Sequence, residues 1–174
     1  MGASISLLVL EPVSTEIIRY SQKMCDVQRS SVRLSEKAEP HVTLLKTRDD
    51  VAISPADVAE AIPDLLGMEV AIDFEGLNIL PSRSGGTWVE IQVLKSDELA
   101  KLHRALIERG VFPEDSVEND IDDLFRTHIT VARFIEDLRN PVPLDVELLR
   151  RKRVKTVLVV GASGNTFYQI PARP

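Results

Sequence analysis

Two short patterns constrain this chain most: His41-Val42-Thr43 and His128-Ile129-Thr130. Each opens an apolar run, HVTLL in the first case and HITVARF in the second, that predicts a β-strand. Because side chains alternate between the two faces of a strand, the His and Thr of each pattern share one face, and the residue between them points into a core. The histidines lie 87 residues apart (128 − 41) in a chain of 174 residues, so we expect two similar lobes that each supply one His and one Thr.

The rest of the chain predicts a mixture of strands and helices. Short or alternating apolar runs indicate strands over 4–10, 41–46, 68–79, 87–94, 127–133, 154–160 and 166–170. Capping residues and helical spacing indicate helices from Ser14 to Cys25, from Ser54 to Gly67 with a break at Pro63, from Ser96 to Arg109, and over 144–149. The polar stretch 28–39 is assigned to neither. Because strands and helices mix without strict alternation, we expect an α+β fold in which residues 1–174 form a single domain.

The net charge and the cysteine content limit which binding partners and which cellular compartment we expect. The net charge of −6 argues against coating of long duplex nucleic acid, which needs many Lys and Arg side chains at the phosphates. A small anionic ligand fits better, and the acidic run between Glu114 and Asp123 is interpreted as a solvated loop and not as a metal site. Cys25 has no disulfide partner and no apolar run is long enough for a membrane span, so we expect a cytoplasmic monomer without a membrane partner.

Two imidazoles and two threonine hydroxyls that face one cleft suit one kind of chemistry. Since a histidine has a pKa of about 6.5, one can be the base and the other the acid at neutral pH. At a phosphodiester, one would take a proton from the attacking water or hydroxyl, and the other would donate to the leaving oxygen. The threonines would hydrogen-bond the phosphate. No cofactor is needed, and a zinc site is disfavoured because neither strand offers a third ligand. The third histidine, His103, falls on a predicted helix beside an apolar stripe and is interpreted as structural.

The two runs HVTLL and HITVARF resemble the paired signature motifs of the 2H phosphoesterase superfamily, which includes the 2′-5′ RNA ligases and the cyclic phosphodiesterases. The resemblance extends over most of the chain, through FEGLNIL, WVEIQV and the final hairpin VLVVGASGNTFYQI. It implies a two-lobed fold, with antiparallel sheets, helices on their outer faces and a central cleft. It also implies His41 and His128 as acid and base, Thr43 and Thr130 as phosphate ligands, and metal-independent chemistry. In one departure, the first motif continues with Leu45-Lys46-Thr47, where RNA-ligase-type members often have Phe-Leu-Gly.

Three further side chains are candidates for contact with a substrate. Arg126 shares the strand face of His128 and is placed to clamp a phosphate, although a surface position at the start of a strand explains it equally well. Trp88 lies on the polar side of its strand, where a base can stack on it or where it packs at the edge of a lobe. The resemblance to the family favours Tyr168 over Phe167 for the cleft.

Three functions remain open at this point. The first is a metal-independent phosphodiesterase that acts on a 2′,3′-cyclic phosphate or on 2′-5′-linked nucleotide or RNA ends. The second is a viral nuclease that degrades cyclic or 2′-5′ oligonucleotide messengers, with which the compact chain is compatible. The third is a module that binds a small nucleotide or RNA end without turnover, and two intact His-x-Thr patterns argue against it. The sequence identifies neither the exact substrate nor which histidine is the base.

Overall fold

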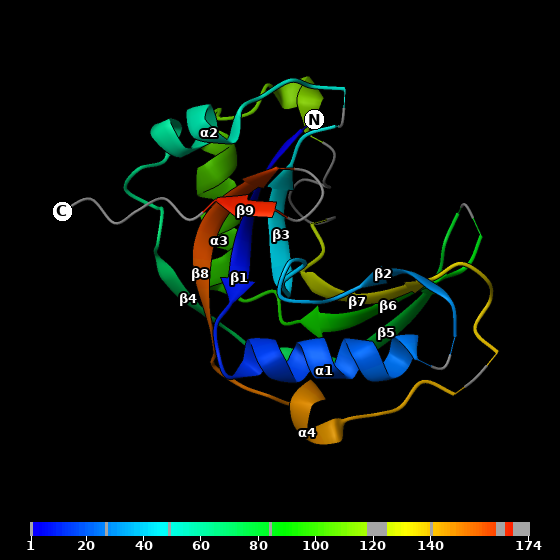
Figure 1. The fold of residues 1–174 in the computed structure, drawn as a ribbon. Helices are drawn as coiled ribbons and strands as arrows, with labels where there is room; N and C mark the ends of the chain where they lie inside the picture. The colour runs from blue at the N-terminus through cyan, green and yellow to red at the C-terminus, as the bar shows by residue number, and fades with distance from the viewer. Residues whose placement is uncertain are drawn as a thin grey trace.

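The computed structural model describes residues 2–26, 28–48, 50–83, 85–117, 125–139, 141–162 and 166–168 (Figure 1). Its fold is α+β, as the order of elements predicts. Two antiparallel sheets stand at an angle to each other, and helices lie on their outer sides. Within the described residues, no helix has the length and apolar content that crossing a bilayer requires.

The first sheet, sheet A, carries the first His-x-Thr pattern on its edge strand. Its strand order is β3-β1-β8-β4, and β9 also pairs with β8. The strands are β1 (Ala3–Val9), β3 (His41–Lys46), β4 (Glu69–Ile72), β8 (Val154–Ala162) and β9 (Thr166–Tyr168). Every residue of β1 is buried, which places this strand at the centre of the sheet and of its core.

The second sheet, sheet B, carries the second His-x-Thr pattern on an inner strand. Its strand order is β2-β7-β6-β5. The strands are β2 (Ser30–Arg33), β5 (Phe74–Pro81), β6 (Thr87–Val93) and β7 (His128–Phe134). Strand β7 of this sheet also contacts β3 of sheet A, so the two motif strands are neighbours across the junction of the sheets.

Not every helix packs on the sheet of the strand that precedes it in the chain. Helix α1 (Val13–Cys25) follows β1 of sheet A but packs on β7 and β2 of sheet B. Helix α3 (Asp97–Glu108) follows β6 of sheet B but packs on β3 of sheet A. The shorter helices α2 (Pro55–Ala61) and α4 (Val146–Leu149) pack on β8 and β5 respectively, and a 3-10 turn spans Glu114–Ser116. The two longer helices, α1 and α3, thus each cover the sheet to which the strand before them does not belong, whereas α2 and α4 pack on the sheet that they follow.

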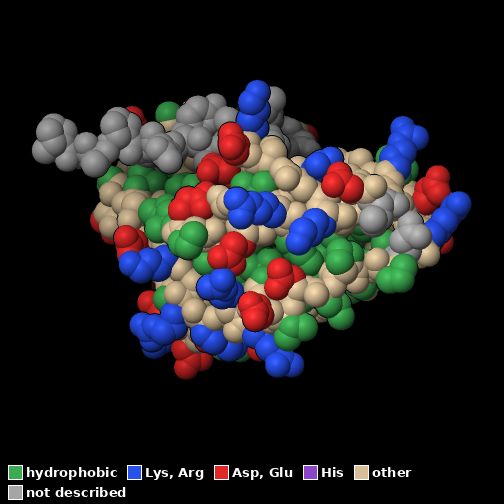
Figure 2. Space-filling model, turned by 60° about the horizontal axis from the view of Figure 1, so that its bottom comes forward, with side chains coloured by type: hydrophobic (Ala, Val, Ile, Leu, Met, Phe, Trp, Pro, Cys, Tyr) green, Lys and Arg blue, Asp and Glu red, His purple; other side chains and the backbone are tan. Residues whose placement is uncertain are grey.

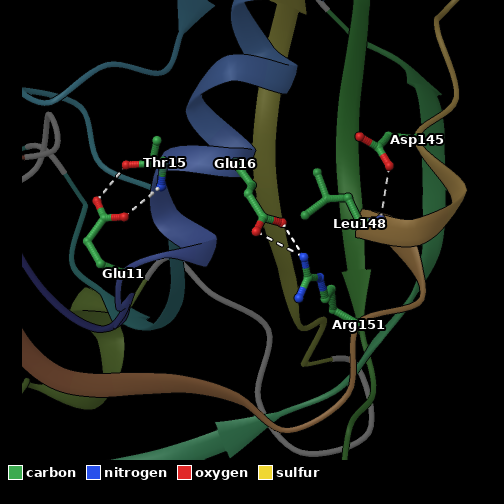
Figure 3. Close-up of polar contacts among 6 residues, drawn as sticks. All are labelled: Glu11, Thr15, Glu16, Asp145, Leu148 and Arg151. Carbon is green, nitrogen blue, oxygen red and sulfur yellow. Dashed lines mark hydrogen bonds and ion pairs between the residues drawn. The ribbon is translucent and has the colours of Figure 1, made fainter.

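Polar contacts fix the start of α1 against the segment that holds α4 (Figure 3). The Thr15 hydroxyl donates to Glu11 Oε1 at 2.8 Å, one turn earlier in the chain. The guanidinium of Arg151 donates to both carboxylate oxygens of Glu16, at 2.9 and 2.7 Å. The ion pair between Arg151 and Glu16 thus joins elements that are distant in sequence.

On the face turned forward in Figure 2, basic and acidic side chains alternate, and neither sign forms a continuous patch.

Each motif strand carries a β-bulge at the same position. The pairing of β3 with β1 slips by one residue, and so does the pairing of β7 with β6. The extra residue is Leu44 in β3 and Val131 in β7, immediately after the Thr of each pattern. Because a bulge places two successive residues on one side, the alternation restarts one residue later. Lys46 and Arg133 therefore return to the strand face of the His and Thr, and both are half-buried.

Ser21 ties α1 to the bulge in β7. Its hydroxyl donates to the backbone carbonyl of Val131 at 2.6 Å and accepts from the backbone N–H of Leu34 at 2.9 Å. The side chain is fully buried. Since a bulge disrupts the ladder locally, this hydroxyl supplies hydrogen bonds that the sheet itself does not.

Four sequence-based boundaries differ from the structure. The first helix starts at Val13 with Pro12 as its N-cap residue, and the Ser14 side chain, predicted to cap it, makes no capping hydrogen bond. The segment 68–79, predicted as one strand, is two strands in different sheets, β4 and β5, and the chain passes from one to the other at Asp73. The Asp73 side chain accepts from the backbone N–H of Arg153 at 2.6 Å, which pins this crossing to the start of β8. The polar stretch 28–39 contains the edge strand β2, and α2 ends at Ala61, ahead of the predicted break at Pro63.

Candidate active site

Strand β3 presents His41 and Thr43 on one face, with Val42 fully buried on the other. His41 Nδ1 lies 2.8 Å from the backbone carbonyl of Glu39. Because a carbonyl oxygen can only accept, this hydrogen bond selects the tautomer with a proton on Nδ1 and leaves the lone pair on Nε2. Burial lowers the pKa of His41, the hydrogen bond to Glu39 raises it in part, and a positive charge on His128 lowers it further. The ring is therefore held in a form that can accept a proton at Nε2.

Strand β7 presents His128 and Thr130 in the same way, with Ile129 fully buried. Burial lowers the pKa of His128, while the carboxylate of Glu90 raises it and the charge of Arg126 lowers it. His128 Nδ1 is buried and makes no hydrogen bond of standard geometry with the described residues, although a backbone contact with Arg126 also raises the pKa of the ring. His128 Nε2 lies 3.5 Å from Glu90 Oε1.

Glu90 is the site residue that sequence reasoning did not single out. Its carboxylate is 7% exposed and accepts a hydrogen bond from Arg126 Nη2 at 2.6 Å. It lies opposite Thr130 in the pairing of β6 with β7, so its side chain is on the face of Thr130 and His128. Alternation along β6 places Glu90 with Trp88 and Gln92 on the polar side of the strand, but only the register between β6 and β7 shows that this is the side of His128.

The cross-strand pairs define one polar surface on sheet B, which we call the histidine face. Direct partners across an antiparallel pair share a face of the sheet. By this rule the histidine face comprises His128, Thr130, Arg133, Trp88, Glu90, Gln92, Gly76, Asn78 and Leu80. The opposite face of β7 contacts α1. The side that bears the catalytic candidates thus also carries the polar side chains of Glu90, Gln92 and Asn78.

The two halves of the site differ at equivalent positions. Because the bulges coincide, β1 relates to β3 as β6 relates to β7, and Ser6 opposite Thr43 corresponds to Glu90 opposite Thr130. Ser6 is fully buried, and its hydroxyl has no hydrogen-bond partner among the described residues. The carboxylate beside His128 thus has an uncharged counterpart on the side of His41.

The other predicted substrate contacts have different surroundings. Arg126 has a side chain that is 53% exposed and is tied to Glu90. Trp88 is half-buried, and the guanidinium carbon of Arg133 lies 4.9 Å from the centroid of its ring. Tyr168 lies in β9, and its side chain is outside the described part of the structure, so its prediction stays open. His103 is buried on α3, with its ring stacked on Phe125 at 3.7 Å between centroids.

The acidic run offers no described metal site. Most of the run from Glu114 to Asp123 lies outside the described residues. Among the residues that are described, no group of three or more His, Cys, Asp and Glu side chains is arranged to hold a metal ion. The candidate site instead contains two imidazoles, two hydroxyls and one buried carboxylate, an arrangement that suits proton transfer.

Comparison with known families agrees with this arrangement. A family model described as the 2′-5′ RNA ligase superfamily matches residues 14–150, a range that contains both His-x-Thr strands. The chain belongs to the 2′-5′ RNA ligase superfamily. This is the 2H phosphoesterase superfamily that the paired motifs indicate, so the family assignment made from the sequence is confirmed. A comparison with curated proteins finds no match to the chain. Membership supports phosphoesterase- or ligase-type activity.

Proposed function

We propose that this member of the 2′-5′ RNA ligase superfamily is a metal-independent phosphodiesterase. Its substrate would be a 2′,3′-cyclic phosphate, or a 2′-5′ linkage, at a small nucleotide or RNA end in the cytoplasm. The observation that carries the proposal is the pair of His-x-Thr strands, β3 and β7, in contact at the junction of the two sheets with matching burial. The family match supports the class of reaction.

We assign the base to His41. Its Nδ1–H is held by the Glu39 carbonyl, so Nε2 carries the lone pair that would take a proton from a water molecule that attacks phosphorus. Burial keeps the pKa of His41 below its usual value, which favours the neutral form that a base requires. The new P–O bond forms to the water oxygen as its proton moves to Nε2.

We assign the acid to His128. The carboxylate of Glu90, 3.5 Å from His128 Nε2, stabilises a proton on that nitrogen, and His41 has no carboxylate at the equivalent position. As the bond from phosphorus to the ribose oxygen breaks, this proton passes to the leaving oxygen. The hydroxyls of Thr43 and Thr130 would donate to the non-bridging phosphate oxygens, where charge accumulates in the transition state. Arg126, which Glu90 orients, would add a positive charge.

The test is hydrolysis by single and double variants across a substrate panel. The panel contains 2′,3′-cyclic mononucleotides, RNA ending in a cyclic phosphate, and 2′-5′ oligoadenylate, each with and without EDTA. We expect His41→Ala and His128→Ala each to lose on the order of 10²–10⁴-fold in kcat, with unchanged circular dichroism and with EDTA without effect. Thr43→Ser, which keeps the hydroxyl, should stay more active than Thr43→Val. Wild-type rates in the double histidine variant, or a strict metal requirement, would overturn the proposal.

A further inference from the structure

A pocket with a volume of about 170 Å³ lies beside His128 on sheet B. Its lining includes Asn78 of β5, Gln92 of β6, and Arg126 just before β7. Gln92 is the direct cross-strand partner of His128, so the pocket begins one strand away from the proposed acid, at a spacing of about 5 Å. The pocket and the candidate active site therefore share the histidine face.

A glycine leaves the surface of sheet B bare next to the residues that line this pocket. Gly76 pairs with Gln92 across β5 and β6, so its side-chain position is on the histidine face next to the amide of Gln92. A Cβ atom built on Gly76 would meet nothing within 4 Å. A glycine within a strand often marks a place where a ligand approaches the backbone closely. Here it leaves open space beside the two amide side chains that line the pocket.

The charges around the pocket are balanced. Arg126 is already paired with Glu90, and the remaining charged groups in the lining are Lys95 and Glu75. A phosphate would need an excess of positive charge, which this lining does not provide. The amides of Asn78 and Gln92 each offer both donors and acceptors. The lining thus suits a neutral, planar ligand with a hydrogen-bonding edge.

Stacking does not account for recognition in this pocket. The ring of Phe125 is 3% exposed and is already stacked on His103. Binding would rest on hydrogen bonds from the amides and from the Glu75 carboxylate. Amide side chains pair with adenine, and carboxylates accept from exocyclic amino groups of bases.

We propose that this pocket is a nucleobase subsite, which holds the base of the nucleoside that carries the scissile phosphate. The inference rests on the proposed function, in which His128 protonates the leaving ribose oxygen. That step places the ribose on the His128 side of the phosphorus, and the attacking water on the His41 side. The base attached to that ribose then lies in the pocket, within reach of the amides of Asn78 and Gln92. Glu75 favours bases that carry an amino group over uracil.

The test compares substrates with and without a base. Hydrolysis is measured for 2′,3′-cyclic AMP, 2′,3′-cyclic UMP and ribose 2,3-cyclic phosphate with wild type, Gln92→Ala, Asn78→Ala and the control Gln22→Ala. Gln22 lies on α1, which covers the opposite face of sheet B. We expect wild type to prefer cyclic AMP over cyclic UMP. Each pocket variant should lose roughly 3- to 10-fold in kcat/KM for cyclic AMP, the loss of one neutral hydrogen bond, and keep its rate on the base-free sugar.

Two results would overturn the subsite. One is an unchanged kcat/KM for cyclic AMP in both pocket variants, and the other is an equal loss on the base-free sugar. Calorimetry with adenosine 2′-monophosphate and ribose 2-phosphate separates this failure from failure of the proposed function. If no substrate is hydrolysed but the pocket variants selectively weaken binding of the adenosine compound, the subsite stands and the proposed reaction does not. Equal binding of both compounds by wild type would reject the subsite independently of turnover.

Discussion

Two buried serines should respond in opposite ways to the same substitution. Ser21 and Ser6 are both fully buried, and each side chain differs from alanine by one hydroxyl. The Ser21 hydroxyl bonds to two backbone groups, the Val131 carbonyl and the Leu34 N–H. The Ser6 hydroxyl has no hydrogen-bond partner among the described residues. Ser21→Ala and Ser6→Ala therefore form a matched pair that differs mainly in hydrogen bonding.

The magnitudes follow from the cost of unsatisfied polar groups. Ser21→Ala leaves a buried carbonyl and a buried N–H without that partner, at about 1–3 kcal/mol for each group, and partial compensation brings the expected loss to about 2–4 kcal/mol. Ser6→Ala removes a hydroxyl that is itself unsatisfied, so it should be neutral or stabilise by up to about 2 kcal/mol. For a chain of this length, the Ser21 loss corresponds to a fall in Tm of roughly 5–15 °C.

Urea denaturation followed by circular dichroism measures both changes. The m-value should stay constant, which shows that the shift in midpoint reports a change in stability. Wild type and the two variants are compared under identical buffer conditions. If Ser21→Ala and Ser6→Ala change the free energy of unfolding by the same amount, the hydroxyl of Ser21 does not support the bulge, and the reasoning fails.

Two further predictions concern protonation. Glu90→Gln removes the charge that raises the pKa of His128, so the basic limb of the profile of kcat/KM against pH should move to lower pH. Glu136→Gln, at an exposed carboxylate, is the control. If Glu90→Gln leaves the basic limb at its wild-type position, the assignment of the acid to His128 is contradicted. Because burial holds the pKa of His41 below its usual 6.5, the unfolded chain binds more protons in acid. The free energy of unfolding should be constant above about pH 6.5. Below that pH it should fall as the pH decreases, until the pH passes the pKa of His41 in the folded protein. In His41→Gln that fall should be smaller, and an identical pH dependence in wild type and variant would refute this.

The fold class was predictable because local patterns decide it. The alternation around His41 and His128 identifies both motif strands, and the Ser96 side chain, which accepts from the N–H of Leu99 at 3.2 Å, begins α3 as predicted. The segment 68–79 misled because its apolar spacing continues through Asp73, where the chain changes sheets. Tertiary contacts mark that change, among them the hydrogen bond of the Asp73 side chain with the backbone of Arg153.

The candidate site was predictable to the extent that it depends on strand alternation. His41, Thr43, His128 and Thr130 follow from period two, and the structure places each pair on one half-buried strand face. Glu90 and the pocket beside it depend on the register between strands, which a bulge shifts by one residue. The sequence does indicate the bulges in β3 and β7. Two successive apolar residues break the alternation of each strand, at Leu44-Leu45 and at Val131-Ala132.

The crossed placement of α1 and α3 links the integrity of the two sheets. Strand β7 is covered by a helix whose chain comes from sheet A, and β3 by a helix whose chain comes from sheet B. If one sheet opened, it would pull away the helix that shields the other sheet from water. Amide hydrogens in β3 and β7 should therefore exchange through the same opening event, with equal free energies. A molecule that binds only one of the two histidines would then strengthen the protection of both strands.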